Sequence, residues 1–282
     1  MSVTTFIPKL WSARLLYHLD KTHVYANLVN REYEGEISQY GDTVHINQLG
    51  DITIKDYNKV DIDAPEELST TDQVLVIDQA KYFNFAIEDI DKAQVRAPLM
   101  DSAMQRTAYA LADTTDNFLA NLMAKDAKIK LGSSATPIAL TIENVYTTLI
   151  QLKVAMDKAN VPSTGRWVVI PPEFEGLMLS DSKFASAYGA NAENRLINGF
   201  VTRACGFDIY TSNNVPVTAG KYSIVASNNT TTTFAEQIVS TEAFRPEASF
   251  KDAMKGLNVY GAKVTQGDAV AVLTATFTEP TK

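Results

Sequence analysis

The residues that could serve a metal site or a nucleophile are few, because the chain holds three histidines and one cysteine. His18 and His23 are five positions apart, which is awkward for one helix face, and neither they nor His45 stand in a metal-binding spacing such as HExxH. Cys205 lacks the surrounding signature of a catalytic cysteine, so a small buried apolar side chain is the favoured interpretation. The sequence contains no nucleophile elbow, Walker loop or dinucleotide-binding glycine motif.

The carboxylates indicate no clearer chemistry. Asp61, Asp63, Glu66 and Glu67 could coordinate calcium, but no EF-hand loop surrounds them. A solvated acidic loop is therefore the favoured interpretation of this stretch. We predict that the chain has no catalytic residue, no metal site and no cofactor, and that it is not an enzyme.

Composition and charge set broader limits. The chain has 282 residues, of which 45% are hydrophobic and 21% charged, which is typical of a globular protein with one large or two modest domains. Acidic residues outnumber basic ones by 33 to 25, which argues against a general nucleic-acid binder. No run of about 18 apolar residues occurs and no signal peptide is evident, so we expect an unexported protein without a membrane span. A single cysteine excludes an intrachain disulfide and favours a reducing compartment.

The first third of the chain contains segments that need a surface to lie on. Trp11, Leu15 and Leu16 follow helical spacing, and this short helix docks either on its own domain or on a neighbouring molecule. Residues 43–47 and 51–55 alternate apolar and polar side chains around a Gln-Leu-Gly turn, which predicts a hairpin. Each strand carries only two aliphatic side chains, and an isolated hairpin is marginal in water. We therefore expect it to pack against another surface, within the chain or on another subunit.

The remaining pattern mixes strands and helices. A 28-residue segment from Pro98 to Lys125 predicts one long helix with an apolar stripe, and the loop at 132–137 is the predicted domain boundary. The last two strands, 257–264 and 269–277, are expected to pair with strands at 73–86. The stripe of the long helix comprises Met104, Ala108, Leu111, Thr115, Phe118 and Leu122. The other expected elements are helices at 141–159, 173–179 and 181–188 and strands at 73–78, 81–86, 166–170, 206–211, 222–226 and 236–240.

In their order along the chain, several of these stretches resemble the major capsid (coat) proteins of tailed bacteriophages, whose Johnson fold is shared with encapsulins and the herpesvirus capsid floor. The stretches are residues 6–46, the strand region 74–95, the helix MDSAMQRTAYALADTTDNFLANLM at 100–123, RWVVIPPEFEGLML at 166–179, and the closing strands at 244–277. The resemblance covers nearly the whole chain.

The resemblance implies an α+β phage capsid fold with four parts. Residues 1–30 would be an N-terminal arm, and residues 31–72 an extended hairpin, the E-loop, that reaches onto an adjacent subunit. Residues 73–136 and 240–282 would form a discontinuous P-domain around a spine helix at about 98–125, and residues 137–239 an α/β A-domain.

It also implies partners. Subunits would form hexamers and pentamers of an icosahedral shell enclosing double-stranded DNA, contacted non-specifically, in a virion assembled in the host bacterial cytoplasm with no membrane contact. A portal and a separate scaffolding protein would take part, since the arm begins almost at Met1. The implied interface residues are Val44, Ile46, Leu49, Ile52 and Ile54 in the E-loop and Trp11, Leu15 and Leu16 in the arm.

Two alternatives stay open at this point. An encapsulin-like nanocompartment shell would have a related fold but an enzyme cargo, and a cargo-docking groove would distinguish it. An enzyme with an unrecognised site would instead show a deep pocket with converging polar groups and perturbed pKa values.

Overall fold

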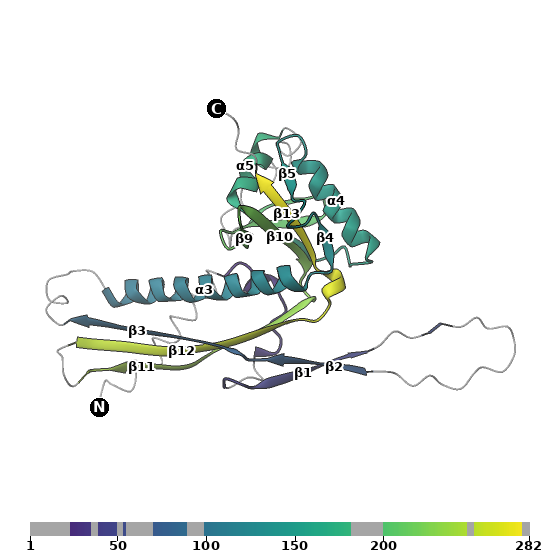
Figure 1. Ribbon diagram of the computed structural model, residues 1–282. Helices are drawn as coiled ribbons and strands as arrows, with labels where there is room; N and C mark the ends of the chain where they lie inside the picture. The colour runs from purple at the N-terminus through teal and green to yellow at the C-terminus, as the bar shows by residue number, and fades with distance from the viewer. Residues whose placement is uncertain are drawn as a thin grey trace, which may run out of the picture.

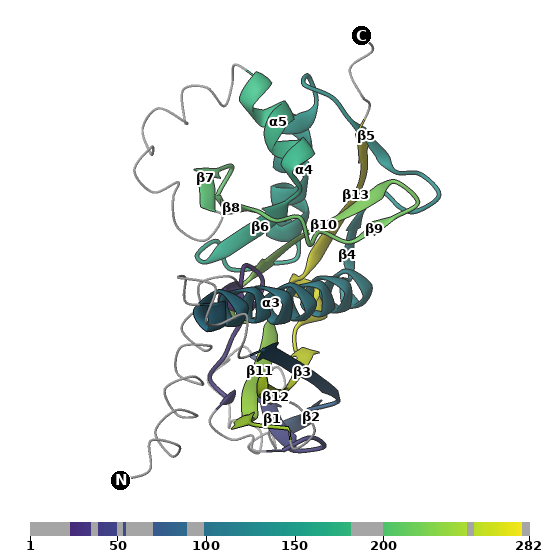
Figure 2. The ribbon, with the colours of Figure 1, turned by 90° about the vertical axis from the view of Figure 1, so that its left-hand side faces the viewer.

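The structure, a computed structural model, describes residues 23–34, 39–49, 53–54, 70–88, 99–181, 200–246 and 251–277. Its described part contains a two-stranded, a three-stranded and an eight-stranded sheet (Figure 1). A long helix lies between the three-stranded and the eight-stranded sheets, as Figure 2 shows from the side. The architecture is therefore α+β, as expected.

The long helix is α3, Leu99–Asp126, and it confirms the helix predicted at 98–125. It covers one face of the three-stranded sheet, whose order is β11 (Thr232–Phe244), β12 (Lys251–Val264) and β3 (Gln79–Glu88). The apolar stripe predicted from its sequence is the face that contacts the sheet, because side chains at i, i+3 and i+4 share one side of a helix. The side chains in this contact are Met104, Ala108, Leu111 and Ala112 from the helix and Phe83, Phe85, Ile238 and Met254 from the strands.

The central strand of this sheet, β12, is antiparallel to both neighbours and buries both of its faces. Its pairing with β3 confirms the expected contact between 257–264 and the strands at 73–86. Residues Met254 and Tyr260 lie on the side of α3, whereas Leu257 and Val259 pack on the opposite side. Successive side chains of a strand point to opposite faces, so a strand that lies between two layers needs apolar residues on both faces, as β12 has.

The layer on the opposite side is the two-stranded sheet of β1 (Thr43–Leu49) and β2 (Thr70–Val76), which are antiparallel. Val44 and Leu75 face each other in the register and share a buried cluster with Ile77, Ala235 and Val259. Among the described residues, β1 pairs with β2 and not with residues 53–54 of the predicted hairpin, whose residues 51–52 and 55 lie outside the described part of the chain. Pairing with β2 places Val44 against the chain's own core.

The eight-stranded sheet forms a second layer system with its own helices. Its central strand β6, Arg166–Ile170, is buried at every residue, and the helices are α4 (Val145–Lys158) and α5 (Pro172–Ser180). The strand order is β4-β13-β10-β6-β8-β7, with β5 on β13 and β9 on β10. The other strands are β4 (Ile129–Leu131), β5 (Ile138–Leu140), β7 (Phe200–Ala204), β8 (Phe207–Thr211), β9 (Val217–Thr218), β10 (Lys221–Asn228) and β13 (Ala271–Phe277).

Three expectations about this region are corrected. The last strand, β13, pairs with β10, β4 and β5 and not with the strands at 73–86. The loop at 132–137 joins β4 to β5 within one sheet, so it is not a domain boundary, and β11 begins at Thr232 on the other side of the expected border at 239. The apolar run of β13 suits its position, because Ala271, Val272 and Leu273 are all buried and a continuous apolar run is typical of a strand that is covered on both faces.

The second predicted helix begins later than expected. It starts at Val145 and not at Thr141, because the Asn144 side-chain oxygen accepts a hydrogen bond from the Thr141 amide at 2.8 Å and closes a turn there. The short helix near 173–179 and the strands near 206–211 and 222–226 are confirmed, and each end differs from the predicted residue by no more than two positions. The polar helix predicted at 181–188 lies outside the described residues, except for Asp181 at its start.

The close approach between β12 and the end of β2 generates a stability prediction. A Cβ at Gly261 would lie 2.3 Å from the Val76 carbonyl oxygen, whereas a Cβ at Gly176 in α5 would meet nothing within 4 Å. We expect Gly261→Ala to lower the free energy of unfolding by about 1–3 kcal/mol through overpacking. Gly176→Ala should raise it by up to about 1 kcal/mol through helix propensity. Urea unfolding of both variants checks this, and equal values would contradict the packing described.

Candidate assembly surfaces and a buried anchor

The structure separates the predicted interface residues into two groups. Val44 is buried, with 4% of its surface exposed, and Ile46 is half-buried against the same internal cluster. Both side chains pack within their own chain, and their role as subunit contacts stays a prediction. Ile54, by contrast, is 94% exposed. Leu49 ends β1, while Ile52, Trp11, Leu15 and Leu16 lie outside the described residues.

Ile54 stands out because burying an isoleucine side chain normally contributes about 1.5–3 kcal/mol to the free energy of folding or association. It lies in the segment between β1 and β2. The only other aromatic or aliphatic side chains in the described part of the chain that are more than 60% exposed are Tyr40, Tyr82 and Tyr109. Such residues indicate candidate contact positions on the surface.

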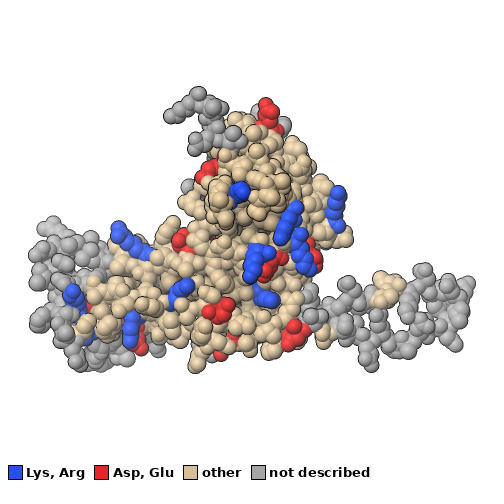
Figure 3. All heavy atoms as spheres, in the orientation of Figure 1, with Lys and Arg blue, Asp and Glu red and all other residues tan. Residues whose placement is uncertain are grey.

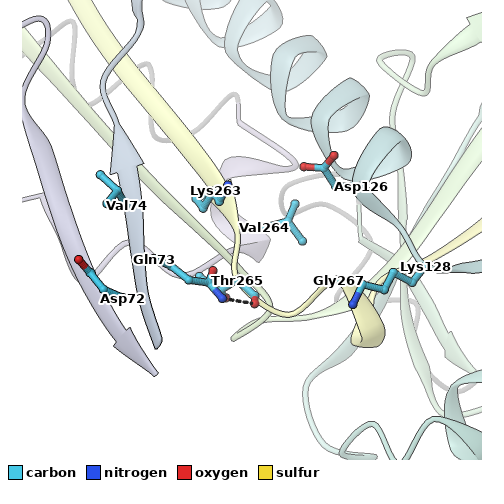
Figure 4. Close-up of a pocket in the computed structure, with 9 residues that line it drawn as sticks. All are labelled: Asp72, Gln73, Val74, Asp126, Lys128, Lys263, Val264, Thr265 and Gly267. Carbon is cyan, nitrogen blue, oxygen red and sulfur yellow. Dashed lines mark hydrogen bonds between the residues drawn. The ribbon is translucent and has the colours of Figure 1, made fainter. Parts of the chain in front are cut away.

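A hollow of about 590 Å³ lies between β2, the end of α3 and the turn after β12 (Figure 4). Two lysines and two aspartates line it, and Lys128 donates to Asp268 beside it at 2.8 Å. The Gln73 amide donates to the Thr265 carbonyl at 3.2 Å, which ties β2 to the turn. No histidine or cysteine lines this hollow. Figure 3 shows Lys and Arg side chains scattered among Asp and Glu side chains over the face of the molecule that it presents.

Cys205 lies in a tight turn between β7 and β8, and two successive positive φ angles, 52° at Cys205 and 83° at Gly206, are typical of a two-residue hairpin. The side chain is half-buried, and burial raises the pKa of its thiol. A protonated thiol is a weak nucleophile, so its position favours a structural role. Among the described residues, no group of three or more His, Cys, Asp and Glu side chains could hold a metal ion, and no helix could span a bilayer.

The structure reveals one polar cluster that sequence reasoning missed, around His23. Its Nδ1 lies 3.3 Å from Asp116 Oδ1 on α3, and its Nε2 lies 3.3 Å from Glu236 Oε2 on β11. All three side chains are almost fully buried, and the Asn258 amide donates to the second Glu236 oxygen at 2.6 Å. The cluster therefore joins the start of the described chain to α3 and to two strands.

Backbone contacts complete this anchor. The amides of Val24 and Ala26 donate to the two Asp116 oxygens at 2.7 and 3.2 Å. Further along the chain, Asn30 exchanges hydrogen bonds with β11, since its amide donates to the Thr232 carbonyl and its carbonyl accepts from the Phe234 amide. Residues 23–30 of the predicted arm are thus docked on their own domain. The sequence offered little indication of this cluster, because no sequence motif relates one histidine to two carboxylates that are far from it along the chain.

The charge state of His23 follows from its surroundings. Burial alone would lower its pKa, but the hydrogen bonds and negative charges of Asp116 and Glu236 outweigh that effect and raise the pKa to about 9. His23 is therefore positively charged near neutral pH and serves as the counter-ion of two buried carboxylates. Tyr25 packs edge-on against Trp167 of β6, with 6.3 Å between the two ring centroids. Its pKa is also raised, because the side chain is buried and lies near the Asp116 charge.

The anchor generates a pH-dependence prediction. Because the pKa of His23 rises from 6.5 in the unfolded chain to about 9 in the folded one, its stabilisation is complete below pH 6.5 and is lost as the pH rises through 9. We expect the wild-type free energy of unfolding to fall by roughly 3 kcal/mol across this window through His23. His23→Gln should lower stability at pH 6 by about 3–5 kcal/mol and flatten the decline.

Urea unfolding at several pH values between 6 and 9.5 measures both effects. The matched control is His45→Gln, since the His45 side chain is 60% exposed beside Asp72. That variant should stay within about 0.5 kcal/mol of the wild type. Parallel pH profiles for the wild type and His23→Gln would contradict the role assigned to the cluster.

Comparisons with known proteins agree with this architecture. A chain from Mycobacterium phage Che8 is 33% identical, with 89% of this chain and 90% of that chain covered and a TM-score of 0.71. The capsid of cyanophage P-SCSP1u is 19% identical, with 92% of this chain and 89% of that chain covered and a TM-score of 0.69. A virus-like particle from Pyrococcus furiosus is 12% identical, with 94% of this chain and 98% of that chain covered and a TM-score of 0.60. The last two likenesses show the fold alone.

No curated protein sequence matches the chain. The family described as phage capsid protein matches residues 70–275, which is well over half of the 282 residues. This match begins with β2 and ends within β13, so it contains all three strands of the α3-covered sheet and all of the eight-stranded sheet except the end of β13. The chain therefore belongs to the phage capsid protein family.

Proposed function

We propose that this chain is the major shell subunit of a tailed phage, and that it assembles into hexamers and pentamers of an icosahedral capsid around double-stranded DNA. The observation that carries the proposal is the 33% identity with a phage chain over 89% of this chain. Assembly would take place in the host cytoplasm with a portal and a separate scaffolding protein. The shell would contact DNA only non-specifically and without holding it tightly, since a net charge of −8 does not favour strong binding to phosphates.

Under this proposal the parts of the chain take the roles that the family suggests. Residues 1–30 are the arm, with Trp11, Leu15 and Leu16 as contact residues beyond the anchored part. The E-loop is narrower than residues 31–72, because β1 and β2 belong to the body, and its contact residues are Leu49, Ile52 and Ile54. The three-stranded sheet with α3 acts as the P-domain and the eight-stranded sheet as the A-domain.

The role of the chain is structural in this proposal. A shell derives its strength from many modest contacts repeated by symmetry, so no single residue needs to perform chemistry. Exposed apolar side chains such as Ile54 supply burial on assembly, and extended strands supply backbone hydrogen bonds.

A nanocompartment shell is the second candidate, and the likeness to the Pyrococcus furiosus virus-like particle supports it through coverage of 94% and 98% of the two chains. The identity of that pair is 12%, against 33% for the phage chain. The phage capsid is therefore the preferred proposal. Purified shells that contain an enzyme cargo and no nucleic acid after expression with the chain's genomic neighbours would favour the second candidate.

Electron microscopy of the purified, overexpressed chain tests the proposal directly. We expect closed particles or rings of six and five subunits. A chain that stays monomeric at all concentrations, alone and with its genomic neighbours co-expressed, would contradict the proposal.

The exposure of Ile54 gives a residue-level prediction. Ile54→Asp should raise the concentration needed for assembly by about ten-fold or more, because a charge replaces apolar area that assembly buries. Ile54→Leu should assemble normally, and circular dichroism should show both variants folded. Ile46→Asp should instead unfold the monomer by placing a charge against the internal cluster. Sedimentation velocity over a concentration series measures assembly, and normal assembly of Ile54→Asp would be the contrary result.

A further inference from the structure

Residues 23–30 contact two bodies of the molecule, and we call this segment the strap. The lower body in Figure 1 is α3 with the three-stranded and two-stranded sheets, and the upper body is the eight-stranded sheet with α4 and α5. His23 contacts the lower body through Asp116 and Glu236, and the Tyr25 ring packs edge-on against Trp167 of the upper body. Four apolar residues of the strap share a buried cluster with β6 and β10, namely Tyr25, Ala26, Leu28 and Val29. The strap therefore connects the two bodies (Figure 2).

The rest of the connection lies at one place, near the end of α3. Between α3 and β13 the described chain passes from one body to the other at residues 127–128, 229–231 and 265–270. Hydrogen bonds hold these crossings together, since the Lys128 amide donates to the Gly267 carbonyl at 3.2 Å and the Thr265 amide donates to the Thr231 carbonyl at 2.9 Å. The three crossings thus form a single junction.

The strap contacts the lower body away from this junction. Asp116 lies ten positions before Asp126, the last residue of α3, which is about 15 Å along a helix. Beside it, a hollow of about 180 Å³ lies between α3 and the residues that follow β8, and Val24 of the strap lines this hollow with Asp116 and Ser212. The two bodies do not close on each other there. A junction at one place permits rotation about it, so a second attachment at a distance is what fixes an angle.

We propose that the strap fixes the angle between the two bodies, and that it does so only while His23 carries a positive charge. Its two attachments differ in kind. On the upper body the strap is held by apolar burial, which does not depend on pH. On the lower body it is held by the ion pairs of His23 and by the amides of Val24 and Ala26, which donate to Asp116. The proposal goes beyond the function proposed above, because it concerns the shape of one subunit.

The charged groups that act on His23 come from two elements of the lower body. Burial alone would lower the pKa of His23, but Asp116 on α3 and Glu236 on β11 raise it to about 9. The other titratable groups nearby stay neutral in this range. Burial and the Asp116 charge raise the pKa of Tyr25, while burial and the Glu236 charge raise the pKa of Tyr260 on β12 to about 12. The pH-dependent event near pH 9 is therefore the loss of the His23 proton.

That loss leaves two carboxylates without their counter-ion. Asp116 and Glu236 are almost fully buried, and a buried charge without its partner is strongly unfavourable. Movement of the His23 end of the strap admits water through the hollow that Asp116 lines, and it leaves the core of each body intact. The other end of the strap, Asn30, stays bonded to Thr232, the first residue of β11 after the junction. An attachment at the junction cannot fix the angle, so the two bodies gain freedom to rotate.

Distances between spin labels on the unassembled full-length chain test this inference by pulsed electron paramagnetic resonance. On a Cys205→Ser background, Tyr82→Cys on β3 and Leu179→Cys on α5 carry one label on each body. Leu179→Cys with Val217→Cys on β9 places both labels on the upper body as the matched control. All three positions are at least half exposed, at 80%, 53% and 50%, so the labels displace no core residue.

We expect a narrow distance distribution for both pairs at pH 7. His23→Gln should broaden the distribution between the bodies by about two-fold or more and leave the control pair unchanged. The chain with His23 intact should show the same broadening at pH 10, and His23→Gln should show no further change there. This pH series needs no substitution in the strap, so it decides the question even where His23→Gln does not fold.

A destabilised variant separates this effect from a general loosening of the fold. Gly261→Ala crowds Val76 and Ile77 and does not touch the strap, so it should keep the narrow distribution between the bodies. An unchanged distribution across the pH series would overturn the inference. Equal broadening of both label pairs, or the same broadening in Gly261→Ala, would also overturn it. None of these outcomes bears on shell assembly, which electron microscopy of the unlabelled chain measures separately.

Discussion

The fold depends on the pairing of β12 with its two neighbours, because that strand is the centre of the sheet that separates two packed layers. Its residues alternate between the α3 side, with Met254 and Tyr260, and the β1–β2 side, with Leu257 and Val259. A shift of one residue in this register would exchange the two sets and leave the His23 cluster without Asn258. The helix, the two-stranded sheet and the anchored start of the chain are thus all positioned by one ladder of backbone hydrogen bonds.

Local sequence patterns predicted most elements of this arrangement. The stripe of α3 and the strands near 81–86, 166–170 and 257–264 depend on side-chain periodicity within one segment, and the structure confirms them. The choice of partner was less predictable. Residues 43–47 alternate in a way that suits either the segment 51–55 or β2, and only the burial of Val44 with Leu75 and Val259 decides between them. Likewise the apolar sequence of β13 suits a strand in either sheet, and the structure places it in the larger one, where residues on both of its faces are buried.

The buried anchor could not be predicted for a different reason. His23, Asp116 and Glu236 are far apart in the sequence, and each looks like an ordinary polar residue in its own segment. Their interaction exists only after α3 has packed on the sheet, and a buried charge is tolerated only because its partners are already in place. Among the residues expected to contact other subunits, the sequence identified the exposed Ile54 and the internal Val44 by the same pattern. Alternation indicates that a side chain needs a surface, but it does not say on which molecule that surface lies.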